Sequence, residues 1–350
     1  MRYPAFLRDG GTIGFVAPSF GCSLEPYRSS FAKTLRRFHR MGYKTVLGPN
    51  VYASDGIGIS STPENCGREL NEAYLSKESD ILISCGGGEL MCEVVPYIDF
   101  GAIAEADPKW YLGYSDNTNF IFLSVTLADT AAVYGPCAAA FGTRRMHPAL
   151  KDTLAVLRGE TSRVSSYPKW ELESLKDEEH PFEPYNCTEK SCIRVFPAGS
   201  AAGADGEAGN VKVSGRLVGG CIDCLSPLVG TEFDRVREFS EKYRDDGILW
   251  FLESCDLNVF GMRRTLWNLK HAGWFEHASG FLIGRPYIYG QPAMGLDQYS
   301  AVTEVLKEFN VPIIMDVDIG HHPPMMPVVA GAMAEAVFDG KKLELGFTYR

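Results

Sequence analysis

The first 160 residues alternate short apolar runs with longer stretches in which apolar residues recur at helical spacing. The short runs are typical of strands buried on both faces. They are Thr12–Ala17, Lys44–Leu47, Ile81–Ser84, Trp110–Tyr114 and Ala132–Tyr134. The helical stretches are Tyr27–Arg40, 62–76, 117–127 and Pro148–Leu157. This alternation predicts a Rossmann-like, doubly wound parallel sheet over residues 1–160.

The pattern changes after residue 160. Residues 161–212 are rich in charged, proline and small residues, and we expect a linker with an active-site loop, because long irregular segments in compact proteins are often functional. Residues 213–350 return to apolar runs with turn glycines, which predicts a C-terminal mixed α/β domain that is partly barrel-like. Its expected strands are Gly215–Val218, Ile248–Leu252, Gly280–Ile283, Pro312–Met315, Val328–Val329, Ala334–Phe338 and Leu343–Phe347, and its helices are Val259–His271 and Leu296–Phe309.

Composition narrows the class of protein. A chain of 350 residues exceeds the usual size of one core, which agrees with two domains. The formal charge of -10 leaves no basic stripe for phosphates, so we expect neither polymeric nucleic acid nor a membrane surface as a partner. The sequence has no leader-like segment and no apolar run long enough to cross a bilayer. Ten cysteines, several of them inside apolar runs, favour reduced, buried thiols in the cytoplasm.

A candidate nucleophile lies in the stretch from Trp110 to Phe120. An apolar run leads through Gly113 into Ser115, an acid and an asparagine, then into a second apolar run, which predicts strand, tight turn and helix. A serine at such a turn has its hydroxyl exposed at the carboxyl edge of the sheet, with backbone N–H groups beside it. Ser115 is therefore the candidate nucleophile; the alternative is that Ser115 or Asp116 only caps the helix.

A glycine-rich turn, Gly86–Gly88, follows the strand at Ile81–Ser84. It lacks the lysine of a P-loop and is not a dinucleotide-binding fingerprint. Its glycines allow backbone N–H groups to approach a ligand closely. We expect Gly87 or Gly88 to form half of an oxyanion hole, with the N–H of Asp116 as the other half. The alternative is a turn that only redirects the chain.

A carboxylate and a histidine in the second domain complete a possible triad. Glu253 ends an apolar strand, where a lone acid is costly unless it is paired or solvated. His321 lies in a loop just after another strand and is the candidate base, while the neighbouring His322 precedes a proline and has a positional role. The order Ser115, Glu253, His321 is that of the α/β hydrolases. The alternatives are a surface acid at Glu253 and a solvated loop at His321.

Two metal sites are also possible from the sequence. Asp316 and Asp318 stand close to the histidine pair, and Cys187-x4-Cys192 with Cys221-x-x-Cys224 could form a four-cysteine zinc site. The loose spacing and the glycines before Cys221 favour packing or free thiols instead. We therefore predict no metal and no cofactor.

With these residues assembled, the sequence resembles the LD-carboxypeptidase family of serine peptidases, and within it the branch of the microcin C self-immunity proteins. Matching segments occur in the order typical of the family and span nearly the whole chain. They are 14–19, Gly87-Gly88, 96–99, 113–118, 215–220, Leu252-Glu253, 280–285 and 318–321. The resemblance implies a Rossmann-like domain that carries the nucleophile, a C-terminal domain that carries the acid and the base, and a cytoplasmic homodimer.

By the same resemblance, Ser115 matches the nucleophile, Glu253 the triad acid and His321 the triad base. Gly87 or Gly88 and the N–H of Asp116 match the oxyanion hole. The chain departs from the family pattern in three places: Cys221 where asparagine is common, His322 where threonine is common, and Glu89–Cys92 where the immunity branch is richer in serine and asparagine.

Three functions follow as expectations. The first is a serine amidohydrolase acting on peptidyl or aminoacyl nucleotides, in which Trp170 would stack on the base. The second is an LD-carboxypeptidase that removes terminal D-alanine from murein tetrapeptides, in which Arg285 or Arg216 would bind the free carboxylate. The third is a small-ligand binding module without catalysis, if the departures at Cys221 and Glu89 have dismantled the pocket.

Overall fold

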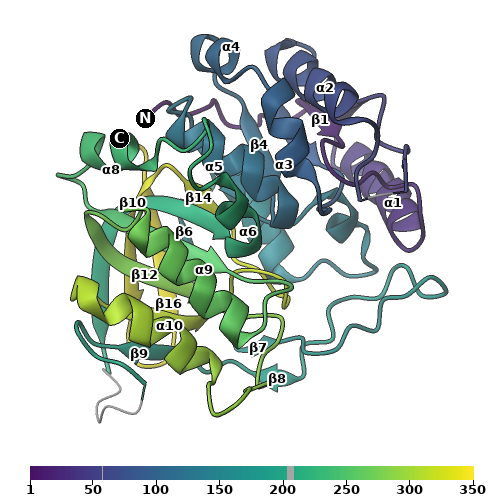
Figure 1. Cartoon of the computed structure of the whole chain (residues 1–350). Helices are drawn as coiled ribbons and strands as arrows, with labels where there is room; N and C mark the ends of the chain where they lie inside the picture. The colour runs from purple at the N-terminus through teal and green to yellow at the C-terminus, as the bar shows by residue number, and fades with distance from the viewer. Residues whose placement is uncertain (57, 203–208) are drawn as a thin grey trace. The chain divides into compact units, whose positions relative to one another are not determined.

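The computed structural model describes residues 1–56, 58–202 and 209–350 (Figure 1). The chain divides into two compact units. Unit 1 comprises residues 1–161, 173–186 and 327–329, and unit 2 comprises residues 162–172, 187–326 and 330–350. The fold expected from the sequence, an α/β chain with a parallel sheet and a second mixed sheet, is confirmed.

Unit 1 is built on a six-stranded sheet in the order β14-β5-β4-β3-β1-β2. The strands are β1 (Thr12–Val16), β2 (Lys44–Leu47), β3 (Ile81–Ser84), β4 (Trp110–Gly113), β5 (Ala132–Tyr134) and β14 (Val328–Ala330). Strands β1 to β5 pair in parallel in the order 2-1-3-4-5, the doubly wound flavodoxin-like arrangement. In such a sheet ligands bind at the carboxyl ends of the strands, near the point where the strand order reverses, here between β1 and β3.

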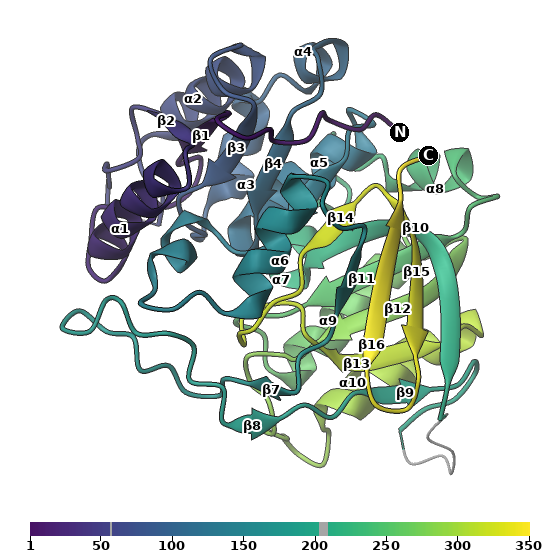
Figure 2. The ribbon, with the colours of Figure 1, turned by 180° about the vertical axis from the view of Figure 1, so that it is seen from behind.

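Helices connect the strands of unit 1. They are α1 (Tyr27–Arg40), α2 (Pro63–Leu75), α3 (Met91–Val94), α4 (Phe100–Glu105), α5 (Thr118–Thr126) and α6 (Pro148–Leu157), with 3-10 turns η1 (Val95–Tyr97), η2 (Ser115–Asn117) and η3 (Ala138–Gly142). Helix α2 contacts α3 and α4, and α4 contacts α5, whereas α1 packs on η3. Figure 2 shows strand β1 between helices α1 and α2. Helix α2 starts as its sequence predicts, with Thr62 as a side-chain cap and Pro63 at its first position.

Unit 2 contains an eight-stranded sheet in the order β6-β16-β15-β10-β11-β12-β13-β9. Its strands are β6 (Arg163–Ser165), β9 (Arg194–Phe196), β10 (Val211–Cys221), β11 (Ile248–Glu253), β12 (Ala278–Gly284), β13 (Ile313–Val317), β15 (Met333–Phe338) and β16 (Leu343–Thr348). The central strands β10 to β13 are parallel and the outer ones antiparallel. With β6 and β9 as edges, the sheet is open over the described residues rather than closed into a barrel.

The helices of unit 2 are α7 (Ile222–Leu225), α8 (Val236–Lys242), α9 (Val259–His271) and α10 (Gln298–Leu306), with 3-10 turns η4 (Ser226–Leu228) and η5 (Lys307–Phe309). Helices α9 and α10 pack against each other and lie side by side in Figure 1. Because β10 to β13 are parallel, Cys221, Glu253, Gly284 and Val317 end their strands at one common edge.

The segment expected as a linker and loop supplies several short strands. Strands β6 and β9 join the second sheet, and β7 (Lys169–Trp170) pairs with β8 (Glu189–Lys190) in a separate two-stranded ribbon. These strands have two or three residues each, too few to give a periodic signal in the sequence. Residues 203–208 of the expected loop lie outside the described residues.

The ten cysteines are all free thiols. Cys85 and Cys137 are buried, as expected from their apolar surroundings, whereas Cys255 is partly exposed. Within the described ranges, every helix is too short or too polar to span a lipid bilayer.

Candidate active site

Ser115 occupies the turn between β4 and α5, where it opens the 3-10 turn η2. Its φ of 61° lies in the left-handed region, which costs a non-glycine residue about 1–3 kcal/mol. The N-cap position of α5, Asn117, makes no side-chain capping bond, so this helix start does not depend on a capping side chain. A strained serine between a buried strand and a helix is the geometry of a nucleophile elbow.

The glycine-rich turn after β3 lies against this serine. A Cβ added to Gly87 would come within 3.0 Å of both Cβ and Oγ of Ser115, so the close approach requires glycine. Gly88 has a φ of 154°, and a Cβ there would collide with the hydroxyl of Ser19. The carbonyl of Gly87 accepts a hydrogen bond from Phe20 N at 2.7 Å. Since the peptide is trans, the N–H of Gly88 points to the opposite side from that carbonyl.

The buried carboxylate of Asp116 joins three segments of unit 1. Its Oδ2 accepts hydrogen bonds from the hydroxyl of Ser19, after β1, and from Met91 N at 2.9 Å, at the start of α3. Its Oδ1 accepts a bond from Asn119 Nδ2 at 3.1 Å. The backbone that follows the candidate nucleophile is thereby fixed to the loops after β1 and β3.

Asn117 makes a second connection to the glycine-rich turn. Its Nδ2 donates to Gly86 O at 2.8 Å and to Tyr114 O at 3.1 Å, and its Oδ1 accepts from the hydroxyl of Tyr111. From the sequence alone, Asn117 is an asparagine at the expected start of a helix, where such a residue commonly forms a cap. The position of Asn117 between a strand and a helix indicates that its side chain forms hydrogen bonds with nearby backbone. The sequence does not show that its partner is the glycine-rich turn after β3.

In unit 2, Glu253 and His321 form a hydrogen-bonded pair. Glu253 is the last residue of β11 and His321 lies in the loop after β13. The Nδ1 atom of His321 is 2.8 Å from Oε2 of Glu253, whose side chain is fully buried. The sequence predicted both residues for a triad, and unit 2 brings them together.

Glu253 and Cys255 both act on the pKa of His321. Burial by itself lowers the pKa of His321. The negative charge of the Glu253 carboxylate, together with hydrogen bonds that the imidazolium donates to Cys255 and Glu253, outweighs burial and raises that pKa well above its usual value. Cys255 was not among the predicted site residues. The only sequence signal for it is its position two residues after the acid.

The loop that carries His321 is held by Asp318. Its Oδ1 pairs with Arg285 at 2.5 Å, and its Oδ2 accepts from Tyr167 N at 2.6 Å. Burial raises the pKa of Asp318, and Arg285 opposes that rise. The Asp318 carbonyl also accepts from Met326 N at 2.7 Å. These bonds fix the backbone three residues before the histidine.

The ring of His322 lies between two backbone carbonyls of unit 2. Its Nδ1 and Nε2 are each 3.1 Å from a backbone carbonyl, those of Glu171 and Tyr287. Its ring stacks on Tyr287 with centroids 5.2 Å apart. Burial is the main cause that lowers the pKa of His322.

The three residues expected to bind substrate have structural partners in unit 2. Trp170 is 4% exposed, and its ring packs against His322 and under the guanidinium of Arg285. Arg285 is 2% exposed and also donates to Ser191 Oγ at 2.6 Å.

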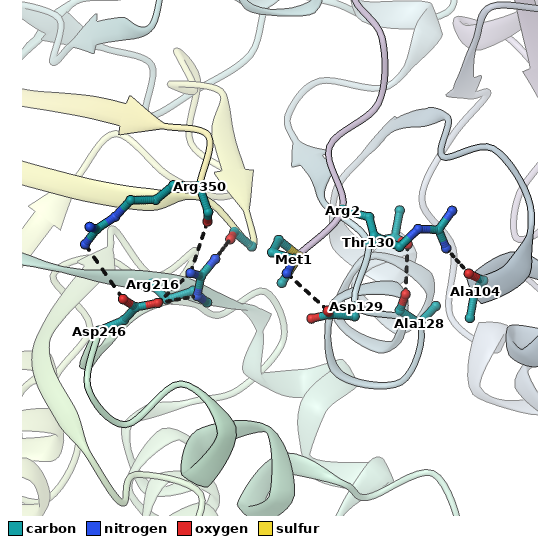
Figure 3. Close-up of polar contacts among 10 residues, drawn as sticks. Met1, Arg2, Ala104, Ala128, Asp129, Thr130, Arg216, Asp246 and Arg350 are labelled. Carbon is teal, nitrogen blue, oxygen red and sulfur yellow. Dashed lines mark hydrogen bonds and ion pairs between the residues drawn. The ribbon is translucent and has the colours of Figure 1, made fainter.

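Arg216 is 3% exposed. Figure 3 shows it paired with Asp246 and donating to the carbonyl of Arg350, and its guanidinium also lies 4.0 Å from the ring centroid of Tyr243. A buried charge that loses its partner is costly, and Arg216 and Arg285 would each have to give up a carboxylate of this chain to bind a ligand carboxylate.

Side chains that could bind a metal ion were also compared. Among the residues that the structure describes, no cluster of three or more histidine, cysteine, aspartate or glutamate side chains is arranged to hold an ion.

Both parts of the chain match one protein family. The model of the LD-carboxypeptidase N-terminal domain matches residues 13–135, and that of the LD-carboxypeptidase C-terminal domain matches residues 214–336. The microcin C7 self-immunity protein MccF of Escherichia coli is 25% identical over 353 residues, which cover 98% of this chain and 95% of that protein. The probable murein peptide carboxypeptidase of Bacillus subtilis is 24% identical over 339 residues, or 95% of this chain and 90% of that protein.

Among solved structures, MccF in complex with glutamyl sulfamoyl guanosine has a TM-score of 0.79 at 22% identity. The match covers 99% of this chain and 98% of the solved one, so the two proteins share one fold along their whole length.

Proposed function

The chain belongs to the LD-carboxypeptidase family, and we propose on this premise that it is a serine hydrolase of amide bonds with Ser115, Glu253 and His321 as its triad. The observation that carries the proposal is the 2.8 Å bond between His321 Nδ1 and the buried Glu253 carboxylate. A nucleophile, a base and a group that orients the base are the three parts required for covalent acyl transfer.

In the proposed mechanism, neutral His321 takes the proton of the Ser115 hydroxyl as its oxygen attacks the substrate carbonyl. Glu253 holds the imidazole in one tautomer through Nδ1 and stabilises the imidazolium that forms. The imidazolium then gives its proton to the leaving amine, and water, activated by the same histidine, releases the acyl group.

The oxyanion would be stabilised by backbone N–H groups. The N–H of Asp116 follows the nucleophile directly, and the Gly87–Gly88 turn supplies the second donor. Of the two glycines, Gly88 is the better candidate for the donor because the Gly87 carbonyl is bonded to Phe20, which fixes the direction of the Gly88 N–H. Gly87 instead lets Ser115 approach, since it has no Cβ.

We propose peptidyl or aminoacyl nucleotides as the substrates. MccF, whose structure contains glutamyl sulfamoyl guanosine, matches the chain over nearly its whole length. The amide between an amino acid and a sulfamoyl nucleotide is the bond that the triad would cleave. The stacking role of Trp170 remains a prediction, and it requires this buried ring to become uncovered.

The second candidate is an LD-carboxypeptidase of murein tetrapeptides. It is favoured by the similarity to the Bacillus subtilis protein named a probable murein peptide carboxypeptidase. A carboxypeptidase needs a cation or N–H donors for the free carboxylate of its substrate. Arg216 and Arg285 remain the predicted cations, although each is engaged by a carboxylate of this chain.

One experiment separates the two substrates. The purified protein is incubated in parallel with an aminoacyl sulfamoyl adenylate and with a murein tetrapeptide, and the products are identified by mass. Release of the free amino acid and the sulfamoyl nucleoside supports the first proposal. Release of D-alanine alone supports the second. Turnover of neither substrate counts against both.

A binding module on the same scaffold is the alternative of another class. A fluorophosphonate forms a covalent adduct only with an activated serine, so labelling tests the triad without knowledge of the substrate. An adduct on Ser115 supports the hydrolase. Binding of the nucleotide by calorimetry with no adduct and no turnover supports the module.

We also propose that the enzyme is a cytoplasmic homodimer. The free thiols at all ten cysteines suit a reducing compartment. The mass of the native protein by light scattering tests the dimer, and a monomer at micromolar concentration would reject it.

A further inference from the structure

Two cysteines of unit 2 lie at a strand-to-helix junction that the proposed hydrolysis does not use. Cys221 is the last residue of β10 and the N-cap of α7, and Cys224 follows within α7. The next strand, β11, is parallel to β10, so the pair stands in a β-α-β unit. A Cys-x-x-Cys motif at the start of a helix in such a unit is the usual setting of a redox-active thiol pair.

The two thiols are already in contact. A side-chain hydrogen bond with Cys224 is the main cause that raises the pKa of Cys221 well above its usual value, and burial adds to it. Residues three apart at a helix start are neighbours on one face, so a small local movement brings their Cβ atoms to the separation of about 3.5–4.5 Å that a disulfide needs. Cys221 is 1% exposed, whereas Cys224 is partly exposed. Only the second thiol is therefore open to a reagent in solution.

Asp223, between the two cysteines, is placed to accept a proton. Its Oδ2 accepts a hydrogen bond from Cys221 Sγ at 3.4 Å. The same carboxylate accepts from the backbone N–H groups of Cys255 at 3.1 Å and Asp256 at 2.8 Å, which fix its orientation. A buried thiol with a raised pKa needs such an acceptor in order to react.

We propose that Cys221 and Cys224 form a reversible disulfide in exchange with a low-molecular-weight disulfide such as oxidised glutathione. The Cys224 thiolate attacks one sulfur of the oxidant, and the first glutathione thiolate leaves, taking a proton from solvent. Cys221 then passes its thiol proton to Asp223, and its sulfur attacks Sγ of Cys224. The second glutathione leaves. Two protein thiols are oxidised, and one glutathione disulfide is reduced to two glutathione molecules.

The position of the pair connects it to the proposed triad. Cys221 is in register with Glu253 across the β10–β11 pair. Asp223 holds the backbone of Cys255, whose thiol hydrogen-bonds to His321. When Cys221 is oxidised, Asp223 loses the hydrogen bond from the Cys221 thiol. Asp223 still binds the backbone N–H of Cys255, so the redox change occurs next to the segment that follows Glu253.

The test maps the thiols of the full-length protein. The protein is equilibrated with glutathione buffers of graded redox ratio, quenched with acid, unfolded, alkylated with iodoacetamide and digested with trypsin. Both cysteines fall in one tryptic peptide, residues 217–235, with no other cysteine. As the buffer becomes oxidising, we expect the doubly alkylated peptide to be replaced by an unalkylated form that has lost two hydrogen atoms. A peptide that stays doubly alkylated, or that stops at a glutathione adduct, overturns the proposal.

Three variants sharpen the result. Cys192→Ser removes an exposed thiol elsewhere in unit 2, and the 217–235 disulfide should form unchanged. In Cys224→Ser the peptide should stay singly alkylated at Cys221 in every buffer. Asp223→Asn should slow the second step, so that a glutathione adduct on Cys224 accumulates; closure at the wild-type rate would contradict the role of Asp223. Circular dichroism of each variant verifies its fold, and the wild-type mapping does not depend on any of them.

Discussion

Gly320 packs directly against Glu253. A Cβ at Gly320 would lie 2.8 Å from Oε2 and 2.9 Å from Cβ of that glutamate. Its φ of 109° is also one that residues with side chains rarely adopt. The loop that presents His321 can therefore reach the buried carboxylate only because this position has no side chain.

Gly320→Ala should separate the pair. The left-handed backbone conformation alone should lower the free energy of unfolding by roughly 1–2 kcal/mol in a residue with a side chain. The clash with Glu253 should lower it further. A displacement of about 1 Å at the base should lower kcat/KM about 100-fold. Urea unfolding and steady-state kinetics measure the two effects.

Gly290 offers a matched control. Its φ of 71° is also in the left-handed region, but a Cβ there meets open space. Gly290→Ala should lower the free energy of unfolding through the backbone conformation alone, and kcat/KM should stay unchanged. Equal activity of the Gly320 and Gly290 variants would contradict a special role for the contact with Glu253.

Ser115→Ala should abolish turnover and leave the fold intact. Without the hydroxyl no acyl-enzyme forms, and the loss in kcat should be about 10⁴-fold or more. The change removes a single hydroxyl oxygen and keeps the Cβ of this residue, so the fold should persist, and circular dichroism verifies it. Full activity in this variant would reject Ser115 as the nucleophile, and the fluorophosphonate adduct should disappear in parallel.

Much of the fold was predictable because long periodic segments carry a strong signal. Helix α1 forms over the predicted residues, 27–40, and β3 over the predicted 81–84. The ribbon β7–β8 was not predictable, since two residues per strand carry no periodicity and the pairing joins positions some twenty residues apart. Strand β10 was predicted too short, because its first half pairs with β15 from the end of the chain.

The candidate site was predictable where chemistry and position coincide. Glu253 and His321 stood out because a charged or titratable side chain at a strand end requires a partner. The burial of Arg285 could not be foreseen, because its partner Asp318 is specified only by the fold. Asn117 was likewise ambiguous, since an asparagine at a helix start also suits a simple cap.

Asn117→Ala tests the anchor of the glycine-rich turn. The change leaves Gly86 O and the Tyr111 hydroxyl without this partner in a buried setting, which should cost about 1–3 kcal/mol of stability. The oxyanion donors should also lose their fixed position, so kcat should fall while KM changes little. Denaturation and steady-state kinetics test both expectations.

Asn186→Ala is the control for this effect. Its Nδ2 also donates to a backbone carbonyl, that of Glu173, but this hydrogen bond is exposed to solvent. It should change the free energy of unfolding by less than about 0.5 kcal/mol and leave kcat unchanged. If the Asn117 variant behaves in the same way, the anchoring role is wrong.

The pH profile should report His321. The base must be neutral to accept the proton of Ser115, and its pKa is raised well above 6.5 by Glu253 and Cys255. kcat/KM should therefore rise with pH, and the midpoint of this rise should lie above 6.5.

Cys255→Ala removes one of the hydrogen bonds that raise the pKa of His321. The midpoint of the pH profile of this variant should therefore move to lower pH, toward but not below that of an isolated imidazole. Cys192→Ala, which changes an exposed thiol, should leave the profile in place. A midpoint that does not respond to Cys255→Ala would show that this thiol does not act on the base.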